Sequence, residues 1–212
     1  LETAGTLFGG KKFWALAKLG EAEAIRANDV VQQYLLLASS CDGSTATEAR
    51  ETAIRVVCNN TISVALSGKT KHSIRITHRE RFNAAEVKKQ LEETGGHFAA
   101  FVQAARLLTK VSVDNAKAEA FLASLLKPLT TREDVADSPA YQAILDLFQG
   151  NAIGGTLLGV PGTAWGLVNA VTEYVDHHAT AKTIDHRLSR AWWGNGADLK
   201  VTAFDKAVEE FA

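Results

Sequence analysis

The sequence lacks most of the features that mark a specialised class of protein. It has no methionine, 3 prolines and 2 cysteines, and no apolar run reaches the roughly 18 residues of a membrane-spanning helix. No signal peptide is visible, and two cysteines make no disulfide framework. We therefore expect a cytoplasmic protein without a membrane partner, in which Cys41 and Cys58 are reduced, buried thiols.

The chain also lacks a large net charge of either sign. Its formal charge is −1, so nucleic-acid binding would have to come from a local patch rather than a global positive field. Its 46% of apolar residues is ordinary for a globular protein with a buried core. Because the chain begins at Leu1 and contains no methionine, we expect a fragment or processed product that lacks upstream residues.

The order of the hydrophobic patterns predicts strands first and helices later. Apolar or alternating segments indicate strands near residues 11–19, 30–38, 53–57 and 73–78. Helical periodicity follows from residue 83, and Thr163 is expected to cap a long helix to about His178. This order favours an α+β fold, with an antiparallel sheet in the N-terminal half packed against a mostly helical C-terminal half. We expect one domain over residues 1–212, strand-rich over 1–82 and helical over 83–212.

The segment 55–66 combines two patterns that rarely adjoin. A β-branched run ends in Asn59 and Asn60, and a helix-period pattern then continues to Leu66. Asparagine is unfavourable inside a strand or helix, but its side chain can cap a helix. We therefore predict a strand-to-helix corner, at which Asn59, Asn60 and Thr61 form a structural or functional site.

Three segments of the chain carry distinctive motifs. Residues 55–66 read R-V-V-C-N-N-T-I-S-V-A-L, residues 162–177 read G-T-A-W-G-L-V-N-A-V-T-E-Y-V-D-H, and residues 187–200 read R-L-S-R-A-W-W-G-N-G-A-D-L-K. In order and spacing they resemble the phage/plasmid-like protein family, a bacterial and viral domain of unknown function (domain of unknown function 932). The resemblance covers essentially the whole chain. It implies a phage- or plasmid-encoded protein of a bacterial host, found among replication and recombination genes, but no particular activity.

A basic stretch precedes the helical half. Only Glu80 dilutes its cations, which are Lys69, Lys71, His72, Arg75, His78, Arg79 and Arg81. On a strand over residues 73–78, Arg75 would face solvent and Ile74 and Ile76 would face the core. Cations on an exposed strand can follow a phosphate backbone, so this stretch, with Lys11 and Lys12, is predicted to bind single-stranded DNA. The same pattern also suits an edge strand that charge protects against aggregation.

Polar and aromatic residues of the C-terminal half suggest two other sites. Glu173 and His177 share a helix face beside Asp176, a spacing that can ligate a metal ion in a nuclease-like enzyme. Candidates for binding a partner chain are Asn169, Glu173, Trp192 and Trp193. Simple solvation, or packing of the tryptophans, explains the same residues.

Together these patterns favour a non-enzymatic DNA-transaction protein, acting in recombination, annealing or replication. It would bind single-stranded DNA and form a homo-oligomer. No nucleophile motif or phosphate-binding loop occurs, so neither a catalytic residue nor a cofactor is predicted. The alternatives are a metal-dependent enzyme and an assembly module of a mobile element.

Overall fold

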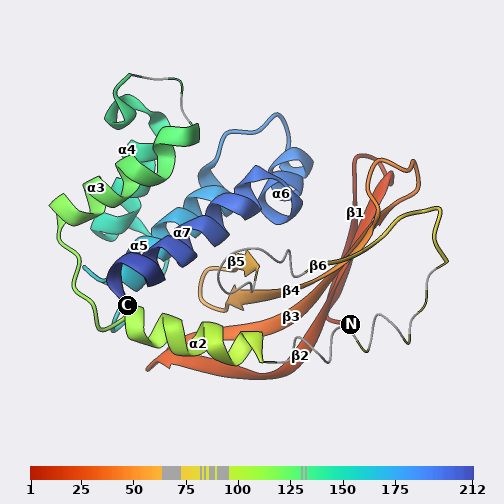
Figure 1. The fold of residues 1–212 in the computed structure, drawn as a ribbon, viewed down its shortest axis with the longest axis horizontal. Helices are drawn as coiled ribbons and strands as arrows, with labels where there is room; N and C mark the ends of the chain where they lie inside the picture. The colour runs from red at the N-terminus through yellow and green to blue at the C-terminus, as the bar shows by residue number, and fades with distance from the viewer. Residues whose placement is uncertain are drawn as a thin grey trace.

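The computed structural model describes residues 1–63, 73–81, 83, 85, 89, 96–129, 131 and 133–212. An antiparallel sheet fills the N-terminal half and helices fill the C-terminal half, which confirms the α+β prediction (Figure 1). The strands are β1 (Thr3–Leu7), β2 (Lys12–Arg26), β3 (Asp29–Ser40), β4 (Thr47–Arg55), β5 (Asn60–Ser63) and β6 (Ser73–Ile76). The α-helices are α2 (His97–Leu108), α3 (Asn115–Leu126), α4 (Pro139–Asp146), α5 (Ala164–Glu173), α6 (Ile184–Trp193) and α7 (Asn195–Phe211).

Short helical turns extend some of these helices. Two are 3-10 turns, η1 (Lys127–Leu129) and η2 (Val135–Asp137). Two are π-helical, namely η3 (Leu147–Asn151), which follows α4, and η4 (Tyr174–His178), which follows α5. None of the helices among the described residues is both long and apolar enough to cross a membrane.

The sheet places alternate turns at opposite ends. Its strand order is β1-β2-β3-β4-β5, and β6 also pairs with β4. Residues 47–50 of β4 pair with β6 and residues 52–55 with β5, so β5 and β6 follow one another along one edge. The β1–β2 and β3–β4 turns therefore lie at one end of the sheet, and the β2–β3 and β4–β5 turns at the other (Figure 1).

The predicted strand-to-helix corner is wrong. Residues 56–59 form the turn of a β-hairpin, and Asn60 pairs with Arg55 at the start of β5. Asn59 has a φ of 56°, in the left-handed region that asparagine adopts more readily than most residues. Asparagine therefore serves a tight turn here rather than a helix cap. Residues 64–66 of the expected helix lie outside the described residues.

Side-chain caps determine where the C-terminal helices begin. The Thr163 hydroxyl accepts a hydrogen bond from the backbone N–H of Gly166, which confirms the predicted start of α5. Thr183 caps α6 in the same way, through the N–H of His186. The sequence patterns did not predict α6, because the segment is rich in polar residues and Ala191 is its only buried residue.

The hydrophobic core draws on both halves of the chain. The ring centroid of Phe101 in α2 lies 6.3 Å from that of Trp165 in α5 and 4.8 Å from that of Phe204 in α7. Val31 of β3 and Ile62 of β5 belong to the same cluster, so the sheet contributes to this core. Each large apolar side chain buried there stabilises the fold by about 1.5–3 kcal/mol. Helices α5 and α7 contact β5, so the edge of the sheet is held against the helices.

Candidate nucleic-acid interface and buried polar network

Two basic segments that are far apart in the sequence meet at one end of the sheet. The β3–β4 turn connects them. The backbone N–H of Cys41 donates to the carbonyl oxygen of Lys11 at 2.8 Å, and a ring nitrogen of His78 lies 2.8 Å from the carbonyl oxygen of Thr45. We call the described cations at this end the turn-end surface, which comprises Lys11, Lys12, Arg75, His78, Arg79 and Arg81. The other predicted DNA-binding residues, Lys69, Lys71 and His72, lie outside the described residues.

The cations of the turn-end surface face solvent. All of them are exposed except Lys12, which is half-buried. Within the described part of the chain, Arg75, Arg79 and Arg81 form no ion pair. Their charges are therefore available to an external anion.

Carboxylates also lie at this end of the sheet. Asp185 accepts a hydrogen bond from the backbone N–H of Phe8, near Lys12, and Asp42 and Glu80 lie in the turns beside the cations. Hydrogen bonds from the hydroxyl and the backbone N–H of Ser44 lower the pKa of Asp42. Hydrogen bonds from the backbone N–H and the hydroxyl of Thr77 lower the pKa of Glu80. These hydrogen bonds hold Asp42 and Glu80 in their own turns without neutralising them. The turn-end surface keeps an excess of positive charge because its lysines and arginines outnumber these carboxylates.

The strand register shows which face of the sheet Arg75 occupies. Trp14 pairs with Ala38, Ala38 with Glu48, and Glu48 with Arg75. Residues directly opposite one another share a face, so Arg75 lies on the same face as Trp14. Glu48 stands between them, but its carboxylate pairs with Arg50 of its own strand.

Aromatic rings border the turn-end surface and include the predicted tryptophan pair. The ammonium group of Lys12 lies 5.8 Å from the ring centroid of Phe8 and 5.6 Å from that of Trp193. Trp192 packs edge-to-face on Trp14, with 4.9 Å between ring centroids. The tryptophan pair therefore anchors α6 on the sheet, and both residues are half-buried.

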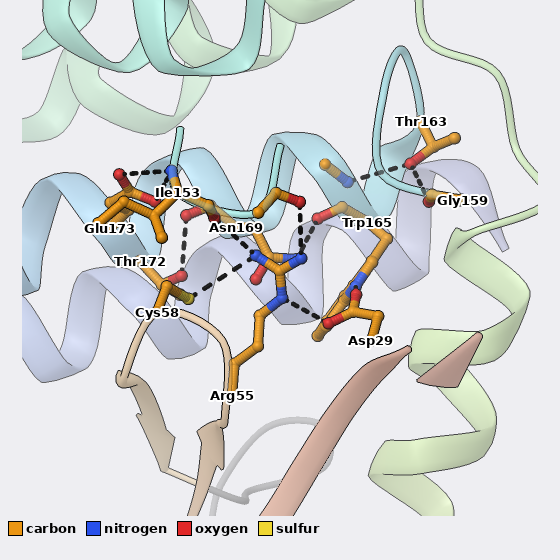
Figure 2. A network of polar contacts seen from close by, with 12 residues as sticks. Asp29, Arg55, Cys58, Ile153, Gly159, Thr163, Trp165, Asn169, Thr172 and Glu173 are labelled. Carbon is orange, nitrogen blue, oxygen red and sulfur yellow. Dashed lines mark hydrogen bonds and ion pairs between the residues drawn. The ribbon is translucent and has the colours of Figure 1, made fainter. Parts of the chain in front are cut away.

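A buried polar network joins the opposite end of the sheet to the helices, as Figure 2 shows. The Arg55 Nε atom lies 2.6 Å from Asp29 Oδ1, and this ion pair is 3% and 0% exposed. Arg55 also donates to the carbonyl oxygens of Ile153 and Gly154, at 3.3 and 3.1 Å. The second oxygen of Asp29 accepts from Trp165 Nε1 at 2.7 Å. The network thus ties two strands to α5 and to the glycine-containing loop before it.

A second buried cluster covers the outer edge of β5. Asp176 accepts a hydrogen bond from the backbone N–H of Thr61 at 2.6 Å, and its other oxygen lies 2.6 Å from Lys200 Nζ. Lys200 also donates to the Thr61 hydroxyl at 2.7 Å. Burial lowers the pKa of Lys200, and the charge of Asp176 opposes that shift. Because Lys200 is 1% exposed, this cluster holds segments together and is closed to a ligand.

The comparison with known families rests on most of the chain rather than on one site. The family model of Domain of unknown function (DUF932) matches residues 1–193. The chain belongs to this family. No curated protein and no solved structure matches it. The three motifs singled out in the sequence meet in the second cluster, since Thr61 lies in the first motif, Asp176 in the second and Lys200 in the third. Lys200 itself follows the residues that the family model matches.

In this DUF932 chain, the candidate metal ligands bind other parts of the protein. Both oxygens of Glu173 accept from the backbone N–H of Ile153 at 3.0 Å, and Asp176 pairs with Lys200. A ring nitrogen of His177 lies 3.0 Å from the carbonyl oxygen of Cys58. Across the described ranges, no three His, Cys, Asp or Glu side chains form a group that could hold a metal. These three side chains therefore hold η4 and the end of α5 against the loop at Ile153, the β4–β5 turn and α7.

The predicted partner-binding stripe on α5 is wrong, because the stripe is buried. Asn169 is 3% exposed and Glu173 is 1% exposed. The side-chain nitrogen of Asn169 donates to the carbonyl oxygen of Trp165 at 2.8 Å. Helix α5 is buried along its whole length, since β5 and η3 cover the side that its polar residues suggested would be solvated. The spacing of polar residues along a helix does not show whether another element packs over its polar side.

Sequence reasoning missed Asp29 and Lys200. Lys200 had a visible signal, because it occupies the apolar face of α7 together with Ala197, Ala203 and Phe204. A lysine on such a face requires a buried carboxylate partner. Asp29 had no comparable signal, since it follows a turn in which an exposed aspartate is equally common.

The two cysteines of this DUF932 chain differ in solvent exposure. Cys58 is buried as predicted, whereas Cys41 is exposed. Burial raises the pKa of the Cys58 thiol, and the thiolate is the nucleophilic form. We therefore expect iodoacetamide at neutral pH to modify Cys41 in the native protein and Cys58 only after unfolding, as measured by peptide mass spectrometry. Cys41→Ser is the control, and rapid labelling of this folded variant would contradict the prediction.

Proposed function

We propose that the chain binds single-stranded nucleic acid without acting on it chemically, as a DNA-transaction protein of a phage or plasmid. The observation that carries the proposal is the meeting of two exposed basic segments at the Cys41–Thr45 turn. A cation that has no internal carboxylate partner can neutralise a phosphate, and the released counterions favour binding. The phage or plasmid setting is supported by the family resemblance.

The shape of the turn-end surface favours a single strand over a duplex. Its described cations come from strand ends and turns, and none of them lies on a helix, the element that most often enters the major groove of a duplex. Phe13 follows Lys12 in β2 and is 47% exposed. It lies on the face of the sheet opposite Trp14 and Arg75, so its ring is open to a base only where a nucleic-acid strand passes over the end of the sheet. Stacking of a base on an aromatic side chain contributes about 1–3 kcal/mol.

The test is a fluorescence-anisotropy titration of a labelled oligothymidylate at several salt concentrations. For the unaltered chain, the logarithm of the association constant should fall by about 0.7 per phosphate contact for each tenfold rise in salt. The double variant Arg75→Ala with Arg79→Ala should bind about tenfold more weakly at low salt, because each exposed charge contributes up to about 1 kcal/mol. Its salt slope should also be shallower by about 1.4.

The matched control removes two exposed cations from the helical half, Lys110→Ala with Lys117→Ala. It should bind as the unaltered chain does, although its net charge changes by the same amount as in the arginine variant. Equal weakening in both double variants would show a general charge effect and refute the turn-end surface. An absence of binding at low salt would refute the proposed function itself.

Self-association belongs to the same proposal. Single-strand binders commonly act cooperatively along a strand, and this is the support for a homo-oligomer. Light scattering with and without the oligothymidylate measures the mass directly. A mass that stays that of one chain at every concentration would reject this part and leave the nucleic-acid site untouched.

A further inference from the structure

The helical half contains a pocket that the polar networks do not use. Its volume is about 420 Å³, within the range of small-molecule sites. It lies between α4, α6, α7 and the segment that follows η4, and Figure 1 shows these helices on one side of the sheet. Leu126, Val175 and Leu199 give it an apolar lining, and Tyr174 adds an aromatic ring.

Two arginines of α6 line this pocket and are held in place. Arg187 Nη1 donates to the carbonyl oxygen of His177 at 3.1 Å. Arg190 Nη1 donates to the carbonyl oxygen of Thr180 at 3.0 Å, and its Nε atom to Asn195 Oδ1 at 3.3 Å. A guanidinium has five N–H donors, so each arginine retains donors for a further partner.

The positive charge of both arginines is uncompensated. Each is bound by neutral oxygens, and neither pairs with a carboxylate in the part of the chain that the structure describes. Carbonyl oxygens orient a guanidinium without neutralising it. Arginines fixed in this way are suited to a carboxylate or phosphate, which a guanidinium binds with two parallel hydrogen bonds.

Tyr174 supplies a neutral polar group to the same pocket. Burial raises the pKa of its phenol, and the charge of Arg190 opposes that shift, so the hydroxyl remains a donor at neutral pH. Tyr174 also begins η4, a π-helical turn of a rare type that occurs frequently at functional sites.

We propose that this pocket binds a small organic anion, whose carboxylate or phosphate group pairs with Arg187 and Arg190 and whose apolar body packs among Leu126, Val175 and Leu199. This binding is independent of the proposed nucleic-acid site, because none of the cations of the turn-end surface lines the pocket. The size of the pocket matches a free small molecule with an aromatic or short aliphatic body.

The probe for the test is 8-anilinonaphthalene-1-sulfonate, an aromatic anion whose fluorescence rises in an apolar pocket. We expect saturable binding of one molecule per chain, and displacement by phenyl phosphate and benzoate but not by phenol. Arg190→Ala should weaken the probe about tenfold, since it removes a charge-assisted contact. Ala140→Trp should abolish binding by filling the pocket, which Ala140 lines, while leaving both arginines in place.

The control variant Arg106→Ala removes an arginine on α2 that lies outside the pocket, and it should bind the probe normally. Unchanged binding by Ala140→Trp would place the probe elsewhere and overturn the proposal, as would an absence of saturable binding up to about 1 mM. Should Arg190→Ala fail to fold, Ala140→Trp decides the question alone. Oligothymidylate binding should be unaffected by Ala140→Trp, so failure of the pocket and failure of the nucleic-acid proposal are distinguishable.

Discussion

Replacing Asp29 by alanine is expected to lower the free energy of unfolding by about 3–5 kcal/mol. The substitution leaves the guanidinium of Arg55, which is 3% exposed, without its only carboxylate partner among the described residues. It also removes the acceptor of the indole N–H of Trp165, which is buried. Since a domain is stable by about 5–15 kcal/mol in total, this loss would leave a large fraction of the chain unfolded under mild denaturing conditions.

Equilibrium denaturation in urea, followed by circular dichroism, measures the effect of Asp29→Ala. Glu21→Ala is the control, because this carboxylate of β2 is exposed and should change the unfolding free energy by less than about 0.5 kcal/mol. Asp29→Asn keeps an oxygen for Trp165 but removes the charge opposite Arg55, so we expect an intermediate loss. Equal stability of Asp29→Ala and the unaltered chain would mean that Arg55 finds another partner and that the network is dispensable.

Gly166→Ala is expected to destabilise the protein by about 3 kcal/mol, although alanine is the better helix former. Gly166 lies in the first turn of α5, where a Cβ atom would overlap the backbone carbonyl group of Val160. Backbone atoms cannot rotate away as a flexible side chain can, so α5 or the loop before it would have to shift. That loop also carries Ile153 and Gly154, whose carbonyl oxygens bind Arg55.

Gly96→Ala provides the matched comparison for Gly166→Ala. Gly96 precedes α2 with a φ of −88°, and a Cβ atom there would meet nothing within 4 Å. The same change of residue should therefore be neutral or stabilise by up to about 1 kcal/mol, because it restricts the unfolded chain. Thermal unfolding of both variants provides the measurement. A Gly166→Ala variant as stable as Gly96→Ala would show that α5 packs less closely than the structure indicates.

The fold class was predictable because it depends on periodicity. Alternation over residues 73–78 and the apolar run over 30–38 correspond to β6 and β3, and Thr163 marked the start of α5. The hairpin turn at Asn59 was not predictable, since asparagine suits both a helix cap and a left-handed turn position. The choice between the two depends on whether the segment after Asn59 forms a helix or a strand. In the structure that segment is β5, which pairs with β4, and the sequence alone does not reveal this pairing.

The site was predictable only where charge was concentrated locally. The basic stretch and Lys11 and Lys12 were identified from composition, but their meeting at one turn depends on the strand register. The polar residues of α5 and η4 were recognised and assigned to the surface, because nothing in their spacing reveals that β5 covers them. Asp29 and Arg55 are 26 residues apart in the chain, and pairing at that separation is a property of the sheet rather than of either segment.

The cover over β5 also limits how the sheet can grow. A strand edge that is left bare can accept an extended peptide or the edge of another molecule, which is the usual route of β-augmentation and of fibril growth. At β5 the backbone N–H of Thr61 is already bonded to Asp176, so an incoming strand would have to displace a buried carboxylate. The described part of the sheet can therefore accept an extended segment at the outer sides of β1 and β6 and along the part of β2 beyond Leu16 that β1 does not pair with. On β6, the exposed charge of Arg75 opposes the docking of an apolar or basic strand.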